Sequence, residues 1–80
     1  MGAFLLSHRH EARECDIAFA AWRGFDSPLR HQSAICSCLH GGHGIWWQID
    51  APNPAAARAL LPAFVAQRTD VIPIADVEIP

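Results

Sequence analysis

The sequence predicts an α+β fold, and two observations support this class. The chain has only 80 residues, and its apolar residues change between strand spacing and helix spacing in the order β-α-β-β-α-β. In so short a chain, this order is typical of a ferredoxin-like sandwich, in which a four-stranded antiparallel sheet carries two helices on one face. Right-handed crossovers then give the strand order 4-1-3-2. We expect residues 1–80 to form a single domain of this kind.

The first half of the chain supplies a strand, a helix and a hairpin. Ala3 to Arg9 is the expected first strand, because a short apolar run ends there in alternation. Glu11 to Arg23 is the expected first helix, since its apolar residues recur at helical spacing. Ser33 to Leu39 and Gly44 to Ala51 are expected to pair as a hairpin, because Gly41-Gly42 can supply the positive φ of a two-residue turn.

The second half supplies one more helix and one more strand. Asn53-Pro54 is a capping residue followed by proline at the first helical position, so a helix is expected from there to Gln67. Pro62 interrupts this helix and removes one backbone hydrogen bond, which should kink the helix between Leu61 and Phe64 at a cost of about 3 kcal/mol if nothing compensates. Thr69 to Ile79 is the expected last strand, and its Pro73 suits a sheet edge.

Histidines and cysteines are concentrated in the first 43 residues, in the pattern HxHxxxxC followed by CxCxHGGH. Seven of the eight such residues of the chain belong to this pattern: His8, His10, Cys15, Cys36, Cys38, His40 and His43. Imidazole and thiolate together suit borderline or soft ions such as Zn, Ni, Cu or Co. The spacing contains no CxxC pair and no HExxH motif, so it matches no standard zinc finger or metalloprotease.

The predicted strand order brings both parts of the pattern to one corner of the sandwich. A two-residue turn would pair His40 with His43, Cys38 with Ile45 and Cys36 with Trp47. The end of the first strand would lie beside this hairpin end, and the first helix would begin close by. The sequence therefore predicts a metal site formed by His8, His10, Cys15 and His43, with Cys38 and His40 as further ligands. For Cys36 the prediction favours a core position.

Composition excludes several classes of partner. The formal charge is −2 and the six basic residues, all arginine, form no stripe, so we expect no nucleic-acid partner. The apolar run Ala3 to Leu6 is too short for a signal peptide or a spanning helix, so we expect no membrane insertion. We therefore expect a cytoplasmic protein, in which three cysteines, an odd count, are thiols or metal ligands and not disulfides. Half of the residues are hydrophobic. Together with the apolar residues Ile35, Leu39 and Trp46, this predicts a homodimer through the open sheet face.

Part of the sequence suggests a family. The stretch HRHEAREC, from His8 to Cys15, resembles the HxHxxExC opening of a group of small uncharacterised bacterial proteins, with the acid of this chain, Glu14, one position later. GGHGIWWQIDAPNPAAARALLPAF is similar to their second hairpin strand and second helix. More distantly, the architecture resembles a small nickel-binding ferredoxin-like family whose members dimerise through the sheet. The resemblance implies metal-binding roles for His8, His10, Cys15 and His43.

These observations favour a small cytosolic transition-metal-binding protein that acts in metal binding, sensing or sequestration. The alternative is a small dimeric enzyme of the α/β-barrel type, a cofactor-independent oxygenase or isomerase that uses His8 or His10 as general base. A third hypothesis is a thiol redox protein that uses Cys36 and Cys38, although successive same-face strand residues are about 6.5–7 Å apart, which is long for a relaxed disulfide. The pattern favours a binding protein over an enzyme.

Overall fold

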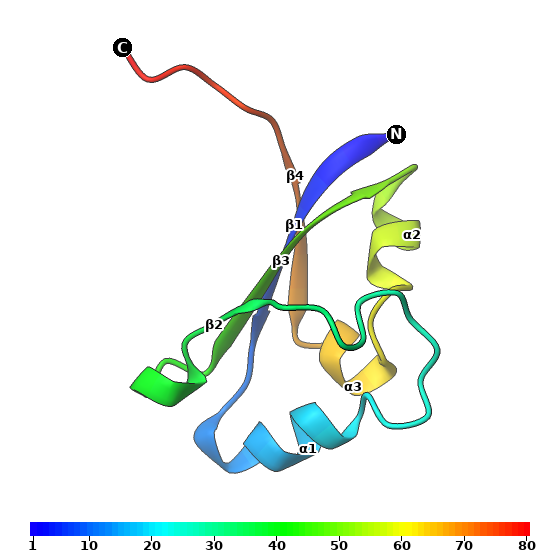
Figure 1. The fold of residues 1–80 in the computed structure, drawn as a ribbon, viewed down its shortest axis with the longest axis vertical. Coiled ribbons are helices and arrows are strands. Elements are labelled where there is room, and N and C mark those ends of the chain that lie inside the picture. Colours follow the sequence, from blue (N-terminus) through cyan, green and yellow to red (C-terminus); the bar gives the residue numbers. More distant parts are fainter.

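One antiparallel sheet of four strands organises the chain, in the order β2-β3-β1-β4 (Figure 1). The computed structural model describes all residues from 1 to 80. The strands are β1 (Gly2–Arg9), β2 (Ile35–Cys36), β3 (Gly44–Ala51) and β4 (Thr69–Ile74). The predicted α+β class and the four-stranded antiparallel sheet are confirmed. Counted from the edge at β4, the neighbours follow each other as 4-1-3-2.

The helices are shorter than the sequence predicts. In place of one helix from Glu11 to Arg23 there are a 3-10 helix η1 (Ala12–Glu14) and an α-helix α1 (Cys15–Ala20). The turn after α1 is held by short-range bonds, such as Arg23 N–H to Ala20 O at 3.0 Å, and ends at Gly24 with φ 74°. The longest helix has six residues, so no helix has the length and apolar character needed to cross a membrane.

The second helical segment begins and breaks where the sequence predicts. Asn53 caps helix α2 (Pro54–Arg58), because its side-chain oxygen accepts a hydrogen bond of 2.8 Å from Ala56 N–H. Pro62 has extended backbone angles (φ −62°, ψ 155°) and separates α2 from helix α3 (Ala63–Ala66). The proline therefore produces two short helices instead of one kinked helix.

The hairpin differs most from the prediction. Strand β2 has two residues, and Cys36 pairs with Ile45 instead of Trp47. The expected two-residue turn is absent, because Cys38–His40 form a 3-10 helix, η2, and Gly41 (φ 83°) and His43 (φ 52°) both take left-handed backbone angles. The pairing therefore shifts by two residues, which keeps Cys36 on the same face of the sheet. Cys36 is nevertheless exposed, because β2 is a two-residue strand at the sheet edge, so its predicted core position is wrong.

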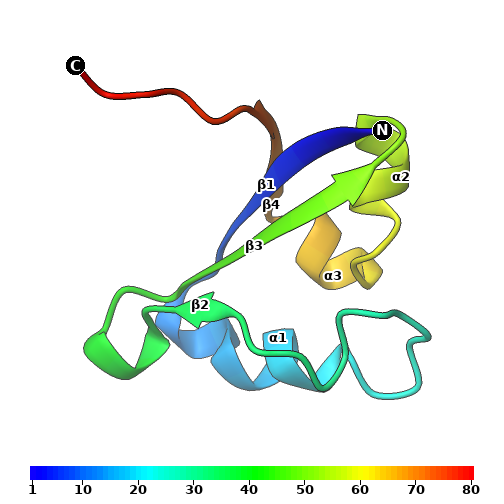
Figure 2. The same cartoon turned by 45° about the horizontal axis from the view of Figure 1, so that its top comes forward.

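The last strand is also shorter than predicted, since β4 ends at Ile74 and not at Ile79. Pro73 lies in β4, an edge strand, where a missing N–H leaves no ladder bond unmade. Figure 2 shows α2 and α3 together beside the sheet, and α1 near the end where β2 lies.

The apolar core runs along one face of the sheet and ends in two histidines. Successive residues of β1 alternate in burial, and the buried ones are Phe4, Leu6 and His8. His10 is also buried, just beyond the end of the strand. Leu6 pairs with Trp47 of β3 and His8 pairs with Ile45. The sheet therefore holds two imidazoles at one end of an otherwise apolar layer.

Truncation of Leu6 tests the position of the core. Leu6 has no exposed surface, so Leu6→Ala should lower the free energy of unfolding by about 2–5 kcal/mol through lost burial and the cavity left behind. Leu39 is 95% exposed, so Leu39→Ala is the matched control and should change stability little. Urea unfolding measures both. Equal losses in the two variants would contradict this core.

Candidate metal centre

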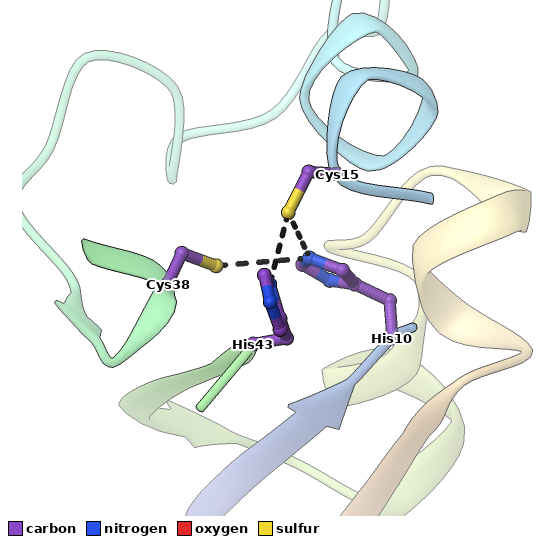
Figure 3. Close-up of side chains that lie close together, drawn as sticks. All are labelled: His10, Cys15, Cys38 and His43. Atoms are coloured by element: carbon purple, nitrogen blue, oxygen red, sulfur yellow. Dashed lines mark hydrogen bonds between the residues drawn. The ribbon is translucent and has the colours of Figure 1, made fainter. Parts of the chain in front are cut away.

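Four segments each place one potential metal ligand at the same end of the sheet (Figure 3). His10 follows β1, Cys15 begins α1, Cys38 begins η2, and His43 directly precedes β3. One donor atom from each of these four side chains lies within 4.8 Å of all the others. His10 is buried, and the other three side chains are half-buried. The structure therefore collects a His2Cys2 set from residues separated by up to 33 positions in the sequence.

Backbone pairing places the two histidines together. His10 N–H donates to His43 O at 3.1 Å, which extends the β1–β3 ladder one step beyond the Arg9–Gly44 pair. The chain then turns through a capping box formed by Glu11 and Glu14. This turn brings Cys15 back toward His10. Arg68 holds Glu14 in place with an ion pair of 3.0 Å.

A tight loop fixes Cys38 relative to His43. Ser37 closes this loop, because its N–H donates to Gly44 O (2.9 Å) and its hydroxyl accepts from Gly44 N–H (3.0 Å). Gly42 N–H donates to Ser37 O at 2.9 Å, and a Cβ atom on Gly42 would collide with the Ser37 hydroxyl. A glycine is therefore required at this position to keep the loop closed.

The donor atoms have separations close to those of a tetrahedral site. His10 Nε2 lies 3.2 Å from Cys15 Sγ and 3.6 Å from Cys38 Sγ, and Cys15 Sγ lies 3.0 Å from His43 Nδ1. Typical zinc bond lengths give sulfur to nitrogen separations of about 3.6 Å around a tetrahedral ion. Side-chain adjustments of about 0.5 Å in these three contacts would therefore accommodate an ion.

His8 lies behind His10, and the neighbours of His8 determine which of its two ring nitrogens carries the proton. The Thr69 hydroxyl donates to Val65 O at 2.6 Å, so the Thr69 oxygen is available only as an acceptor. His8 Nδ1 lies 3.2 Å from that oxygen and 3.3 Å from Val65 O. Both neighbours of His8 Nδ1 are acceptors. This nitrogen therefore carries the proton of the neutral ring.

The same hydrogen-bond chain orients His10. His8 Nε2 lies 2.8 Å from His10 Nδ1, and in the neutral His8 ring it is an acceptor, so His10 Nδ1 donates. The lone pair of His10 then resides on Nε2, which faces the two thiols. Burial, and secondarily the neighbouring imidazole, lowers the pKa of His8 and of His10, which favours these neutral forms. Metal-ligating histidines typically have a partner of this kind on the second ring nitrogen.

Cys38 is held as a neutral thiol when no cation is near. Burial raises the pKa of the Cys38 thiol to about 12, and the neighbouring thiols of Cys36 and Cys15 contribute in the same direction. Cys38 is nevertheless half-buried and not fully enclosed. A bound cation would reverse this preference, because a metal ion displaces the proton of a coordinating thiol. The site thus has the chemistry of one that releases protons on metal binding.

The structure separates the six predicted ligands into two groups. His10, Cys15, Cys38 and His43 come together. His8 contacts His10, but both of its ring nitrogens are engaged in the hydrogen bonds described above, so it lies outside the cluster as an orienting residue. His40 is exposed on η2 and also lies outside it. The physical reason is that Cys38–His40 form η2 and do not continue β2, so His40 does not share a strand face with Cys38.

Sequence reasoning missed two residues that position the site. The Thr69 hydroxyl holds the His8 ring by a hydrogen bond. Ser37 holds the loop that carries Cys38. Thr69 could have been found, since antiparallel pairing places the start of the last strand beside the end of the first, and Thr69 pairs with His8. Ser37 had no comparable signal, because its role depends on a loop geometry that the expected two-residue turn excluded.

Comparison of the chain with protein-family models, with curated proteins and with solved structures found no match. The functional argument therefore depends on the geometry of the chain itself.

The lowered histidine pKa values predict that the metal-free protein loses stability in acid. Unfolding returns each imidazole to its ordinary pKa of 6.5, so below that pH the unfolded chain binds protons more readily than the folded chain. The stability that the two neutral imidazoles provide is complete above pH 6.5. It is lost as the pH falls through 6.5 toward the lowered pKa values of His8 and His10 in the folded chain. The urea midpoint, measured with chelator at about pH 7.5 and about pH 5.5, should therefore decrease in acid.

Two variants identify the source of this dependence. His8→Gln removes one buried titrating ring and should flatten the pH profile. His40→Gln removes an exposed ring and should leave the profile as in the parent protein. A midpoint that does not change between the two pH values, or a larger effect from His40→Gln, would contradict the buried and neutral assignment.

Proposed function

We propose that the protein binds one transition-metal ion through His10, Cys15, Cys38 and His43, and that its role is metal binding, sensing or sequestration. The observation that supports this most directly is the convergence of four ligand atoms within 4.8 Å. The lone pair of His10 directed at two thiols supports it further. Coordination by His8 or His40, also predicted from the sequence, is not part of this proposal.

The donor set favours zinc among the candidate ions. Two thiolates and two imidazoles in a tetrahedral arrangement are typical of zinc, while Ni, Cu and Co bind the same ligand types. Four protein ligands would leave no open position for a reactive water, which is the arrangement of non-catalytic zinc sites. This supports a binding role over a hydrolytic one.

The exposure of the site supports exchange of the ion with solvent or with a partner. Cys15, Cys38 and His43 are each half-buried, whereas His10 is buried. An ion could therefore reach the cluster from the side of the three half-buried ligands without unfolding of the chain. Sensing and sequestration both require such a path.

The enzyme alternative is weakened by the position of its proposed base. A cavity does exist between α1 and the sheet, but neither His8 nor His10 is among the residues that line it. The His8 ring is enclosed by Thr69, Val65 and His10. A general base must reach the proton it removes, so this cavity does not favour His8 or His10 in that role.

We propose further that the fold is a ferredoxin-like sandwich with shortened helices. We also propose that the chain forms a cytoplasmic homodimer through the open face of the sheet. Ile35 on that face is 73% exposed, and Trp46, its partner in the β2–β3 pair, is half-buried. The Trp46 ring is tied to Ser7 by a hydrogen bond of 3.1 Å. A rigid aromatic beside an exposed aliphatic residue supports a protein contact at this face.

Metal titration distinguishes the ligands from the orienting residue. The untagged parent protein should bind one Co²⁺ per chain and develop the intense visible absorption of a tetrahedral thiolate site. His10→Ala and Cys38→Ser should lose that spectrum. His8→Gln should retain one ion per chain but bind it about 10–100-fold more weakly, because it loses only the partner of His10.

His40→Ala is the matched control, since it removes an imidazole close in sequence to Cys38 but outside the cluster. It should bind Co²⁺ as the parent protein does. The proposal fails if the parent protein binds no ion, or if His40→Ala weakens binding as much as His10→Ala does.

The dimer proposal has its own test. Trp46→Glu places a charge on the open face and should convert the dimer to monomers in sedimentation analysis, because burying an unpaired charge at an interface is unfavourable. Arg13→Glu changes charge on an exposed side chain of η1 and should leave the dimer intact. A Trp46→Glu protein that still sediments as a dimer would exclude this face as the interface.

A further inference from the structure

A cavity of about 390 Å³ lies between α1, the connection that precedes β2, and the helix-facing side of β3. Trp22 and Phe19 line it from the helical segment, and Ile45 and Trp47 line it from the strand. Cys36 borders it as well, and Cys36 Sγ accepts a hydrogen bond of 3.3 Å from Cys38 N–H. The cavity is therefore adjacent to the metal centre but separate from it.

The walls of the cavity are suited to a flat aromatic group. The Trp22 and Trp47 rings lie with centroids 5.7 Å apart and an interplanar angle of 49°. Phe19, on the same wall as Trp22, is 53% exposed and leaves apolar surface open to a ligand. Aromatic rings bind other aromatic rings in stacked or edge-to-face arrangements. Three such rings around one cavity favour a ligand with a planar apolar body.

The polar part of the lining is cationic. Arg23 and Arg30 both line the cavity, together with His31 and Gln32, and no aspartate or glutamate does so. Arg30 is half-buried and its guanidinium donates to Phe25 O at 3.5 Å. Two guanidinium groups without a neighbouring carboxylate in the lining favour an anion, and a carboxylate matches the guanidinium fork.

The backbone at the cavity rim gives a further indication. His31 has φ 66°, a left-handed conformation that costs free energy in a residue other than glycine. Arg30, His31 and Gln32 are consecutive, and all three line the cavity.

We propose that this cavity binds a small aromatic carboxylate, with its ring against Trp22 and Trp47 and its carboxylate paired with Arg23 and Arg30. A volume of about 390 Å³ is at the lower end of the range for ligand sites, so it suits one or two fused rings and no larger molecule. The site is independent of the metal centre, since none of its contacts requires an ion.

Nuclear magnetic resonance with two matched probes tests the proposal on the metal-free protein and on the zinc-loaded protein. The probes are 2-naphthoate and 2-naphthamide, which share the ring and differ in charge. Addition of 2-naphthoate should shift the indole N–H signals of Trp22 and Trp47. The indole N–H signal of Trp46 should not shift, because this group donates to the Ser7 hydroxyl on the opposite face. 2-Naphthamide should bind more weakly than 2-naphthoate, by about fivefold or more.

Single charge-removing variants identify the anion contacts. Arg23→Gln and Arg30→Gln should each weaken 2-naphthoate binding by about fivefold while leaving 2-naphthamide binding unchanged. Arg13→Gln, outside the lining, is the control and should match the parent protein. The dispersion of the backbone N–H signals of the protein verifies that each variant is folded. Equal affinity for the two probes, shifts confined to Trp46, or no shift of Trp22 and Trp47 at millimolar probe would overturn the proposal.

Discussion

The antiparallel pairing of β1 with β3 is the constraint on which the rest of the structure depends. It aligns the apolar face of β1 with that of β3, so that Leu6 lies beside Trp47 and His8 beside Ile45. Its last backbone contact, between His10 N–H and His43 O, also places the two imidazoles of the candidate site next to each other. One ladder therefore determines both the core and the position of the metal centre.

The buried histidines are compatible with a folded chain that holds no ion. Every buried side-chain nitrogen and oxygen has a hydrogen-bond partner, so the cluster imposes no unpaired polar group on the core. The chain of bonds from Val65 O through His8 to His10 fixes the lone pair of His10 in advance. An ion that binds only this folded form would add its binding free energy to stability. This differs from small zinc domains that are unfolded without metal.

The sequence was sufficient for the elements whose signals are local or depend on strand order. The Asn53 cap, the break at Pro62 and the edge position of Pro73 each follow from one residue type with one backbone consequence. The strand order then placed His10, Cys15, Cys38 and His43 at one corner. Burial of both His8 and His10 followed from strand alternation, which left open which of the two faces the thiols.

The errors arose where several weak local preferences compete. Gly41-Gly42 is compatible with a two-residue turn, but the hydroxyl and backbone groups of Ser37 stabilise a longer loop with η2 inside it. With this loop the pairing shifts by two residues, β2 ends at Cys36, and His40 lies exposed on η2 outside the site. The first helix was overestimated because apolar spacing alone does not reveal where the chain leaves the sheet. Phe19, one of the apolar residues at helical spacing in this segment, is more than half exposed.

X-ray absorption spectroscopy of the untagged zinc-loaded protein tests the central claim most directly, because it counts the atom types around the ion. The account predicts one zinc per chain with two sulfur ligands at about 2.3 Å and two nitrogen ligands at about 2.0–2.1 Å. A coordination shell of nitrogen and oxygen alone, or a protein that retains no zinc, would contradict it.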